Sequence, residues 1–226
     1  MELKFSNLTI TLPDNMDEIT FGDWLLYSKE VEGFDKLDPE SIEAQIKLFR
    51  ICEILAGLPE GGLDDLRLEE ATTLISVLTE LINKPADFKA AEAFQIEGTW
   101  YATRKIKDMN SLTNGEYISL KTIQTEYEKD PLLFLPLVVA ILVRPAEEVI
   151  DAETGIKTWK VEKFQSRDIE NLNWRATIFR ERAKAKDLIP VINFFLSGKP
   201  LSTNNIETSL AEEQKQTKEE IPSQQQ

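Results

Sequence analysis

The residue types that most often carry out catalysis are scarce in this chain. Its 226 residues include no histidine and one cysteine, Cys52. Without histidine there is no imidazole general base, no histidine metal ligand and no Ser-His or Cys-His nucleophile. A single cysteine also excludes an intramolecular disulfide and Cys/His zinc sites, and it favours a reducing compartment. Because Cys52 lies in an apolar helical pattern, we interpret it as a small buried hydrophobe.

Carboxylates are the remaining side chains that could take part in catalysis or metal binding. Adjacent acidic residues occur at positions 64–65, 69–70, 147–148 and 219–220. Carboxylate catalysis or a Mg²⁺ site stays open on this basis. However, none of these pairs adjoins a specialised glycine-rich loop, and the chain lacks the G-x-x-x-x-G-K-[ST] and G-x-G-x-x-G patterns. We therefore interpret the pairs as solvated acidic faces and expect no enzyme activity, no cofactor and no metal.

The formal net charge of −14 is unevenly distributed. Residues 1–90 hold 19 acidic and 8 basic residues and carry −11, whereas residues 91–200 are neutral. A negative field disfavours binding to a phosphate backbone. The N-terminus lacks the pattern of a signal peptide. The longest apolar run, residues 132–143, falls short of the roughly 20 residues that span a bilayer. We expect neither nucleic acid nor membrane as a partner.

Two similar segments predict two similar helix starts. Residues 19–25 read ITFGDWL and residues 112–118 read LTNGEYI. Thr20 and Thr113 have the position of N-caps, and the acidic residue three positions later completes a capping box. The apolar residue before each cap and the aromatic residue after it, Trp24 or Tyr117, have the spacing of a hydrophobic staple. The pattern indicates an internal repeat.

Further signals recur in the same order in both halves. Alternating apolar residues around a turn predict hairpins over residues 3–12 and 93–103. Asp-Pro pairs at residues 38–39 and 130–131 predict helix starts, and Lys-Pro pairs at 84–85 and 199–200 predict helix ends. The second half adds a hairpin within residues 149–161 and a helix over about 167–183 with Ser166 as N-cap.

These signals predict an α+β, mainly helical fold with two related hairpin-plus-three-helix units produced by internal duplication. The first unit covers residues 1–88, and the second covers residues 89–200 and contains the inserted hairpin. Residues 201–226 are polar and nearly devoid of aromatic residues, so we expect a disordered tail.

Two groups of residues are candidates for protein binding. Phe21 and Tyr27, near the first helix start, are candidates for a partner-facing surface, with core packing as the alternative. A basic stretch in an otherwise acidic chain is the other candidate. It can pair with the acidic first unit, within one chain or between chains, or it can be an ordinary exposed helix face. Its members are Arg175, Arg180, Arg182, Lys184 and Lys186.

The pattern resembles a group of small proteins of tailed bacteriophages. The resemblance lies in residues 19–24, 112–117, 140–145 (AILVRP), 159–162 (WKVE) and 191–196 (VINFFL). It is clearest over about residues 90–200. The group comprises tail-assembly-chaperone-like proteins of phages that infect Bacteroidetes, including crAss-like phages. Val143 departs from the pattern, because tyrosine is more frequent there. No catalytic motif accompanies the resemblance.

The resemblance implies a non-enzymatic phage assembly factor, a tail assembly chaperone or adaptor that binds other proteins. Its partners would be phage proteins of the tail or tape-measure class, met in the cytoplasm of the bacterial host, and a homo-oligomer stays open. One alternative is a structural virion component such as a head–tail connector or ring protein. Another is an acidic inhibitor that mimics nucleic acid, suggested by the charge of −11 on residues 1–90.

Overall fold

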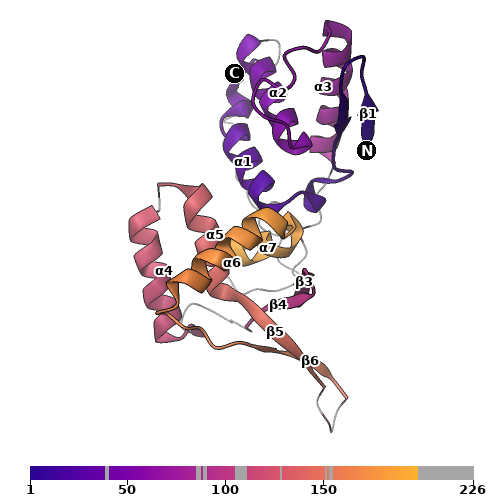
Figure 1. The fold of residues 1–226 in the computed structure, drawn as a ribbon. Coiled ribbons are helices and arrows are strands. Elements are labelled where there is room, and N and C mark those ends of the chain that lie inside the picture. The colour runs from indigo at the N-terminus through magenta and orange to yellow at the C-terminus, as the bar shows by residue number, and fades with distance from the viewer. Residues whose placement is uncertain are drawn as a thin grey trace, which may run out of the picture.

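A computed structural model describes residues 1–38, 41–84, 88, 91–104, 111–127, 129–150, 152 and 155–197. Helices predominate among these residues and two small antiparallel sheets accompany them (Figure 1), so the predicted α+β, mainly helical class is confirmed. The predicted tail, residues 201–226, and the Lys-Pro pair at 199–200 lie outside the described residues.

The first half consists of a short hairpin followed by helices (Figure 1). β1 and β2 pair antiparallel, with Leu3 opposite Ile10, which confirms the predicted hairpin. The elements in order are β1 (Glu2–Lys4), β2 (Thr9–Thr11), η1 (Met16–Glu18), α1 (Phe21–Val31), η2 (Phe34–Lys36), α2 (Ile42–Ala56) and α3 (Leu68–Asn83).

The second half combines helices with a sheet of order β3-β4-β5-β6. Tyr101 on β4 pairs with Phe94 on β3 and with Pro145 on β5. The outer part of β5 pairs with β6 in a ribbon that extends away from the helices (Figure 1). The elements are β3 (Ala93–Ile96), β4 (Thr99–Thr103), α4 (Asn114–Tyr127), α5 (Pro131–Leu142), β5 (Val143–Ile150), β6 (Lys157–Val161), α6 (Ile169–Arg182) and α7 (Ala185–Ser197).

Both predicted N-caps are present, but only the second capping box is complete. The Thr113 hydroxyl accepts from the Glu116 amide at 3.3 Å, and the Glu116 carboxylate accepts from the Thr113 amide at 2.7 Å. At the first site the Thr20 hydroxyl accepts from the Asp23 amide at 3.1 Å and itself donates to the Asp23 carboxylate at 2.6 Å. The Asp23 carboxylate therefore bonds the cap hydroxyl rather than the cap amide, consistent with its shorter side chain.

Three local predictions need correction. Helix α2 is capped by Ser41, whose hydroxyl accepts from the Ala44 amide, and not by Asp38. Helix α6 is capped by Asp168 and not by Ser166. In each case a second residue with a good capping side chain stands within three positions of the predicted one, so spacing alone does not decide. The third correction concerns Tyr117, which is 45% exposed and so is not buried as a staple. Its counterpart Trp24 is half-buried and packs against the core. The predicted cap at Asp130 is confirmed.

Each half of the chain contributes side chains to the hydrophobic core of the other half. The first core is formed by residues of the β1–β2 hairpin, α2 and α3, together with Ala185 and Ile189 from α7. The second core is formed by α4 to α7 and the β3–β4 strands, together with Phe21 and Leu25 from α1. Trp24 packs against both cores. The predicted units at residues 1–88 and 89–200 therefore do not have separate cores.

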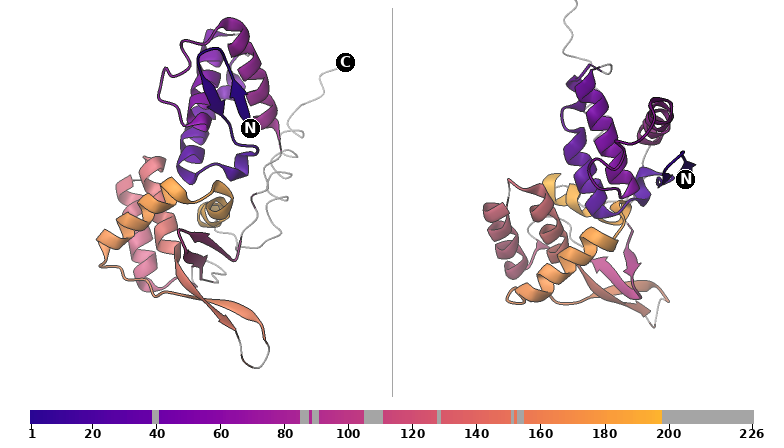
Figure 2. Two further views of the ribbon diagram at one scale, coloured as in Figure 1. Left: turned by 45° about the vertical axis from the view of Figure 1, so that its right-hand side comes forward. Right: turned by 45° about the horizontal axis from the view of Figure 1, so that its top comes forward.

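A short backbone junction accompanies this exchange. The Phe21 amide donates to the Ala183 carbonyl at 2.8 Å, and the Ala185 amide donates to the Ile19 carbonyl at 2.9 Å. Thr20 and Lys184 thereby form an antiparallel bridge between segments that are far apart in sequence. We call residues 19–21 with 183–185 the junction. It fixes the first turn of α1 beside the start of α7 (Figure 2).

The order of elements in the two halves follows the predicted unit in part. Each half begins with a hairpin, continues with a helix that starts at a threonine cap, and then adds further helices. The second half inserts the β5–β6 ribbon and α6 before α7. This common order is compatible with duplication but does not demonstrate it, so the internal duplication stays a prediction.

Gly22 tests how tightly the first turn of α1 packs against α6. A Cβ atom on Gly22 would lie 2.7 Å from the Arg180 carbonyl oxygen, whereas one on Gly115, its counterpart in α4, would lie no closer than 3.6 Å to any neighbour. We expect G22A to destabilise the protein by about 1–3 kcal/mol through overpacking. G115A should be neutral or stabilise by up to about 1 kcal/mol, because alanine favours helix. Urea unfolding followed by circular dichroism measures both. Equal effects of the two substitutions would contradict the close packing.

Glu18 should make the junction sensitive to acid. Its carboxylate pairs with Lys184 and Lys186, and hydrogen bonds from these two lysines lower its pKa below the ordinary value of 4.5. A carboxyl with a lowered folded-state pKa stabilises the fold above that ordinary value and loses this contribution as the pH falls through the folded-state pKa. E18Q should therefore cost less than about 1 kcal/mol at pH 7, because the pair is partly exposed, and less still in acid. Thermal unfolding from neutral to acid pH measures this, and a pH-independent difference would refute it.

Candidate protein-binding groove

Helix α2 has apolar residues on two opposite faces. Ala44, Ile51 and Leu55 lie on its buried face. Ile42 and Ile46, one turn apart, point away from that face and are 76% and 62% exposed. A helix with a single core-facing stripe keeps polar residues on the opposite side. Among the residues that the structure describes, packing does not account for this second apolar face.

An open groove lies beside this second face, between α2 and the start of α3. In Figure 2 α3 lies to one side of α2, with which it shares the first core. The groove has a volume of about 790 Å³. Leu68, at the first position of α3, is 83% exposed at its edge. The lining residues are Glu30, Ile46, Phe49, Arg50, Glu53, Glu60, Gly61, Leu63, Asp64, Leu66, Leu68 and Ala71. We call this the α2–α3 groove.

The charges in the groove are mainly negative. Among the described residues that line it, Arg50 is the one cation, and its guanidinium lies 3.2 Å from the Glu53 carboxylate and 3.7 Å from that of Glu60. Glu53 is buried, whereas Glu60 and Asp64 are exposed. With Glu30, the described lining of the groove holds four acidic residues and one arginine. The groove therefore combines an apolar floor with an acidic rim.

The structure places Phe21 in the core and not at the predicted partner-facing surface. Its side chain is fully buried in the second core and stacks on Trp24 with ring centroids 6.2 Å apart. Tyr27 is half-buried and packs against the first core, where burial raises the pKa of its hydroxyl. The core-packing alternative holds for Phe21, so its assignment as a contact residue is wrong.

The basic stretch divides into buried, paired and exposed residues. Arg175 is buried and donates to the Ala140 carbonyl at 3.3 Å, so its assignment to an exposed basic surface is wrong. Lys184 and Lys186 pair with Glu18 of the first half, so the predicted pairing occurs within one chain. The remaining two are on the surface: Arg182 pairs with Glu97 at 2.8 Å, and Arg180 lies 3.8 Å from Glu181.

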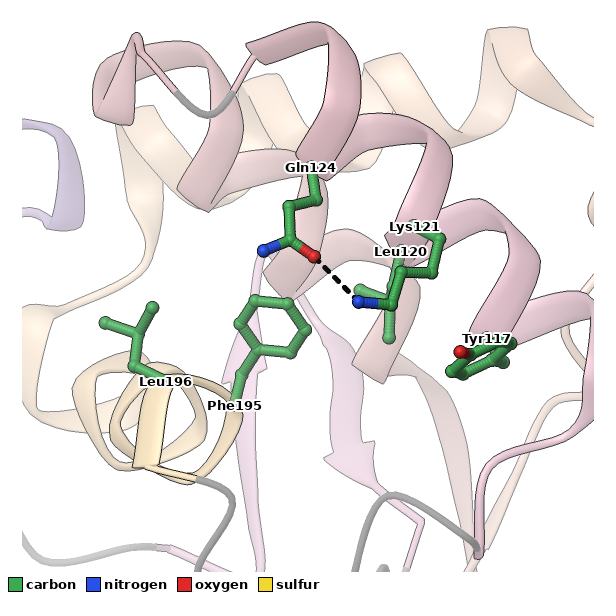
Figure 3. A pocket seen from close by; sticks show the side chains of 6 residues that line it. All are labelled: Tyr117, Leu120, Lys121, Gln124, Phe195 and Leu196. Carbon is green, nitrogen blue, oxygen red and sulfur yellow. Dashed lines mark hydrogen bonds between the residues drawn. The ribbon is translucent and has the colours of Figure 1, made fainter.

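Two smaller hollows lie in the second half. One lies between α4 and α7, where Tyr117, Lys121 and Gln124 face Phe195 and Leu196 (Figure 3); it has a volume of about 210 Å³. Lys121 donates to Gln124 across its wall at 3.1 Å. The other, of about 250 Å³, lies between α5 and α6. Neither has the size of the α2–α3 groove, which makes that groove the stronger candidate site.

The β5–β6 ribbon carries a second group of exposed apolar side chains. Val149, Ile150 and Ile156 lie near its outer end and are 40%, 59% and 61% exposed. Nearer the helices, Trp100 of β4 and Trp159 of β6 meet with ring centroids 4.9 Å apart. Exposed apolar residues that gather in this way commonly mark contact surfaces.

A buried ion-pair cluster joins α4 to the sheet. Glu116 is fully buried, and its carboxylate lies 2.8 Å from the Arg144 guanidinium and 3.0 Å from that of Arg104. Arg144 is itself buried and lies 5.8 Å from the Phe164 ring centroid. Desolvation by burial lowers the pKa of Arg144, and the Glu116 charge opposes this shift. Because the groups pair with one another and lie away from the hollows, we assign them a structural role.

The structure adds two observations on chemistry. Cys52 is buried as predicted, and burial raises the pKa of its thiol to about 12, which makes it a poor nucleophile at neutral pH. Across the part of the chain that the structure describes, no group of three or more candidate side chains could hold a metal ion. Within the same residues, no helix has both the length and the apolar character needed to cross a membrane.

The groove residues were not singled out by the sequence. A usable signal was present, since the segment over residues 42–55 has more apolar positions than one helix face can bury. Apolar residues beyond one face indicate either a second buried face or a binding surface. Without knowing which elements pack on α2, the pattern does not distinguish these two cases.

Replacing Glu116 should show how much the buried ion-pair cluster contributes to the free energy of unfolding. We expect E116Q to destabilise the protein by about 3–5 kcal/mol, because Arg144 would remain buried without its counter-charge. The matched control is E148Q on the ribbon, which breaks an exposed pair with Lys157 and should cost about 0–1 kcal/mol. Urea unfolding measures both variants. A loss for E116Q as small as that for E148Q would contradict the structural role of the cluster.

No family model, curated protein or solved structure matches this chain. The resemblance to phage assembly proteins therefore stays a prediction.

Proposed function

We propose that this protein is a non-enzymatic assembly factor, a tail assembly chaperone or adaptor of a tailed phage, that binds other proteins through the α2–α3 groove. The observation that carries the proposal is the second apolar face of α2. Ile42, Ile46 and Leu68 are the most exposed of the large apolar residues among the described first-half helices. Ile46 and Leu68 line one open groove, and Ile42 lies one turn before Ile46 on the same face of α2. Apolar patches of this kind, rimmed by polar groups, are typical of protein interaction sites.

The phage context is supported by the resemblance in residues 19–24, 112–117 and 140–145. An assembly chaperone holds its client transiently, so its binding surface must remain exposed when the client has left. A groove that is open in the isolated chain meets this requirement. Because the groove floor is apolar, binding would shield apolar segments of the client from premature association.

A structural virion component is the second candidate, and the ribbon favours it. A projecting two-stranded ribbon with exposed Val149, Ile150 and Ile156 could reach a neighbouring subunit in a ring. The two candidates differ in what happens after assembly. A chaperone leaves the finished particle, whereas a ring subunit remains in fixed copy number.

Quantitative mass spectrometry of purified phage particles and of infected-cell lysate distinguishes them. We expect the protein to be abundant in the lysate and absent from the particle. We also expect I46S/L68S to lower the particle yield strongly, because it removes two apolar contacts from the groove. The control I118S/I169S changes residues that are 54% and 64% exposed in the second half, and it should leave the yield unchanged.

The opposite results would count against this function. A fixed stoichiometry in the particle would favour the structural candidate. Equal particle yields with I46S/L68S and I118S/I169S would remove the groove from the proposal. Circular dichroism of both purified variants has to show native helix content, so that loss of folding is not mistaken for loss of binding.

A further inference from the structure

We propose that the α2–α3 groove binds a basic amphipathic helix of a partner protein. The apolar stripe of that helix would lie on the groove floor, and its lysine or arginine residues would face the acidic rim. The inference rests on the proposed function and adds to it the chemistry of the segment that is bound.

The floor of the groove is shaped by helices. Ile46, Phe49 and Glu53 line the groove along a single face of α2, and Ile42 continues this face by one turn outside the hollow. At 1.5 Å per residue this face is about 16 Å long, which matches about three turns of a partner helix. Leu66 and Leu68 form the opposite side at the start of α3. A helix that presents apolar residues three and four positions apart can contact both sides at once.

The rim selects the charge of the partner. Glu30, Glu60 and Asp64 line the groove beside its apolar residues, and the guanidinium of Arg50 already lies near Glu53 and Glu60. The surrounding residues 1–90 carry −11, so the wider field has the same sign as the rim. A segment with acidic flanks would meet repulsion, whereas one with basic flanks would be attracted before contact.

A second copy of this chain is a poorer occupant. Its basic stretch is largely engaged within the chain, because Lys184 and Lys186 pair with Glu18 and Arg175 is buried. A small molecule also fits less well, since the apolar surface continues outside the hollow onto Ile42. Nucleic acid would meet the negative rim with its phosphates. A basic segment of another protein matches both the floor and the rim.

The test uses a series of fluorescein-labelled helical peptides of about 18 residues. All share leucines at positions i, i+3, i+4 and i+7, and their flanking residues vary from glutamate to lysine. Fluorescence anisotropy gives the dissociation constant of each peptide for the full chain at low and at high salt. We expect affinity to rise with the positive charge of the peptide, and we expect this trend to weaken at high salt because exposed charges are screened.

Variants of the full chain locate the effect. I46S/L68S should weaken binding of the basic peptide about tenfold or more, as expected for loss of apolar contacts near the centre of an interface. E60Q/D64N should flatten the dependence on peptide charge. E126Q/E170Q changes the net charge equally, at exposed positions in the second half, and should leave that dependence intact. I118S/I169S is the matched apolar control.

Several outcomes would overturn the inference. Equal binding of acidic and basic peptides, with I46S/L68S weakening both, would refute the charge selection while leaving protein binding by the groove in place. A charge trend that E60Q/D64N and E126Q/E170Q affect equally would assign it to the whole chain. Absence of binding by every peptide would refute the inference. The particle yield of I46S/L68S would still test the proposed function separately. A dimer in sedimentation that I46S/L68S dissociates would identify a second copy as the occupant.

Discussion

The junction between residues 19–21 and 183–185 is the constraint on which the rest of the structure depends. Its two backbone hydrogen bonds join segments near opposite ends of the described chain. They position the first turn of α1 so that Phe21 and Leu25 enter the second core, and they position α7 so that Ala185 and Ile189 enter the first. Each half thus completes the core of the other. Small displacements at the junction would disturb both cores, because packed interiors tolerate little change in shape.

The same arrangement leaves α2 with a free outer face. Helix α1 contributes Phe21 and Leu25 to the second core, and α2 packs against α1 and the first core. Helix α3 covers part of the first core but stands apart at its start, where Leu68 is exposed. The groove lies between the outer face of α2 and the start of α3, within the first half. It is bordered by helices whose opposite sides are fixed, so we expect it to be largely formed before a partner binds.

Local signals predicted much of the fold, whereas long-range contacts decided the candidate site. The hairpins at residues 3–12 and 93–103 and the cap at Thr113 follow from turn and capping chemistry within a few residues. The burial of Phe21 depends on α6 and α7, which lie far away in sequence, so its aromatic character alone left two interpretations. The exposure of Ile42 and Ile46 could not be predicted either, because it depends on which elements pack on α2. Apolar side chains are ordinarily assigned to a core.

Site-specific photo-cross-linking in cells that produce the phage particle tests most directly whether the α2–α3 groove contacts the partner. A photoreactive residue is placed at position 46 in the groove or at position 118 on α4, both of which are exposed. We expect strong cross-links from position 46 to one lysine- or arginine-rich amphipathic segment, identified by mass spectrometry, and weak or scattered cross-links from position 118. Equal cross-linking from both positions, or cross-links from position 46 to acidic or non-helical segments, would contradict this expectation.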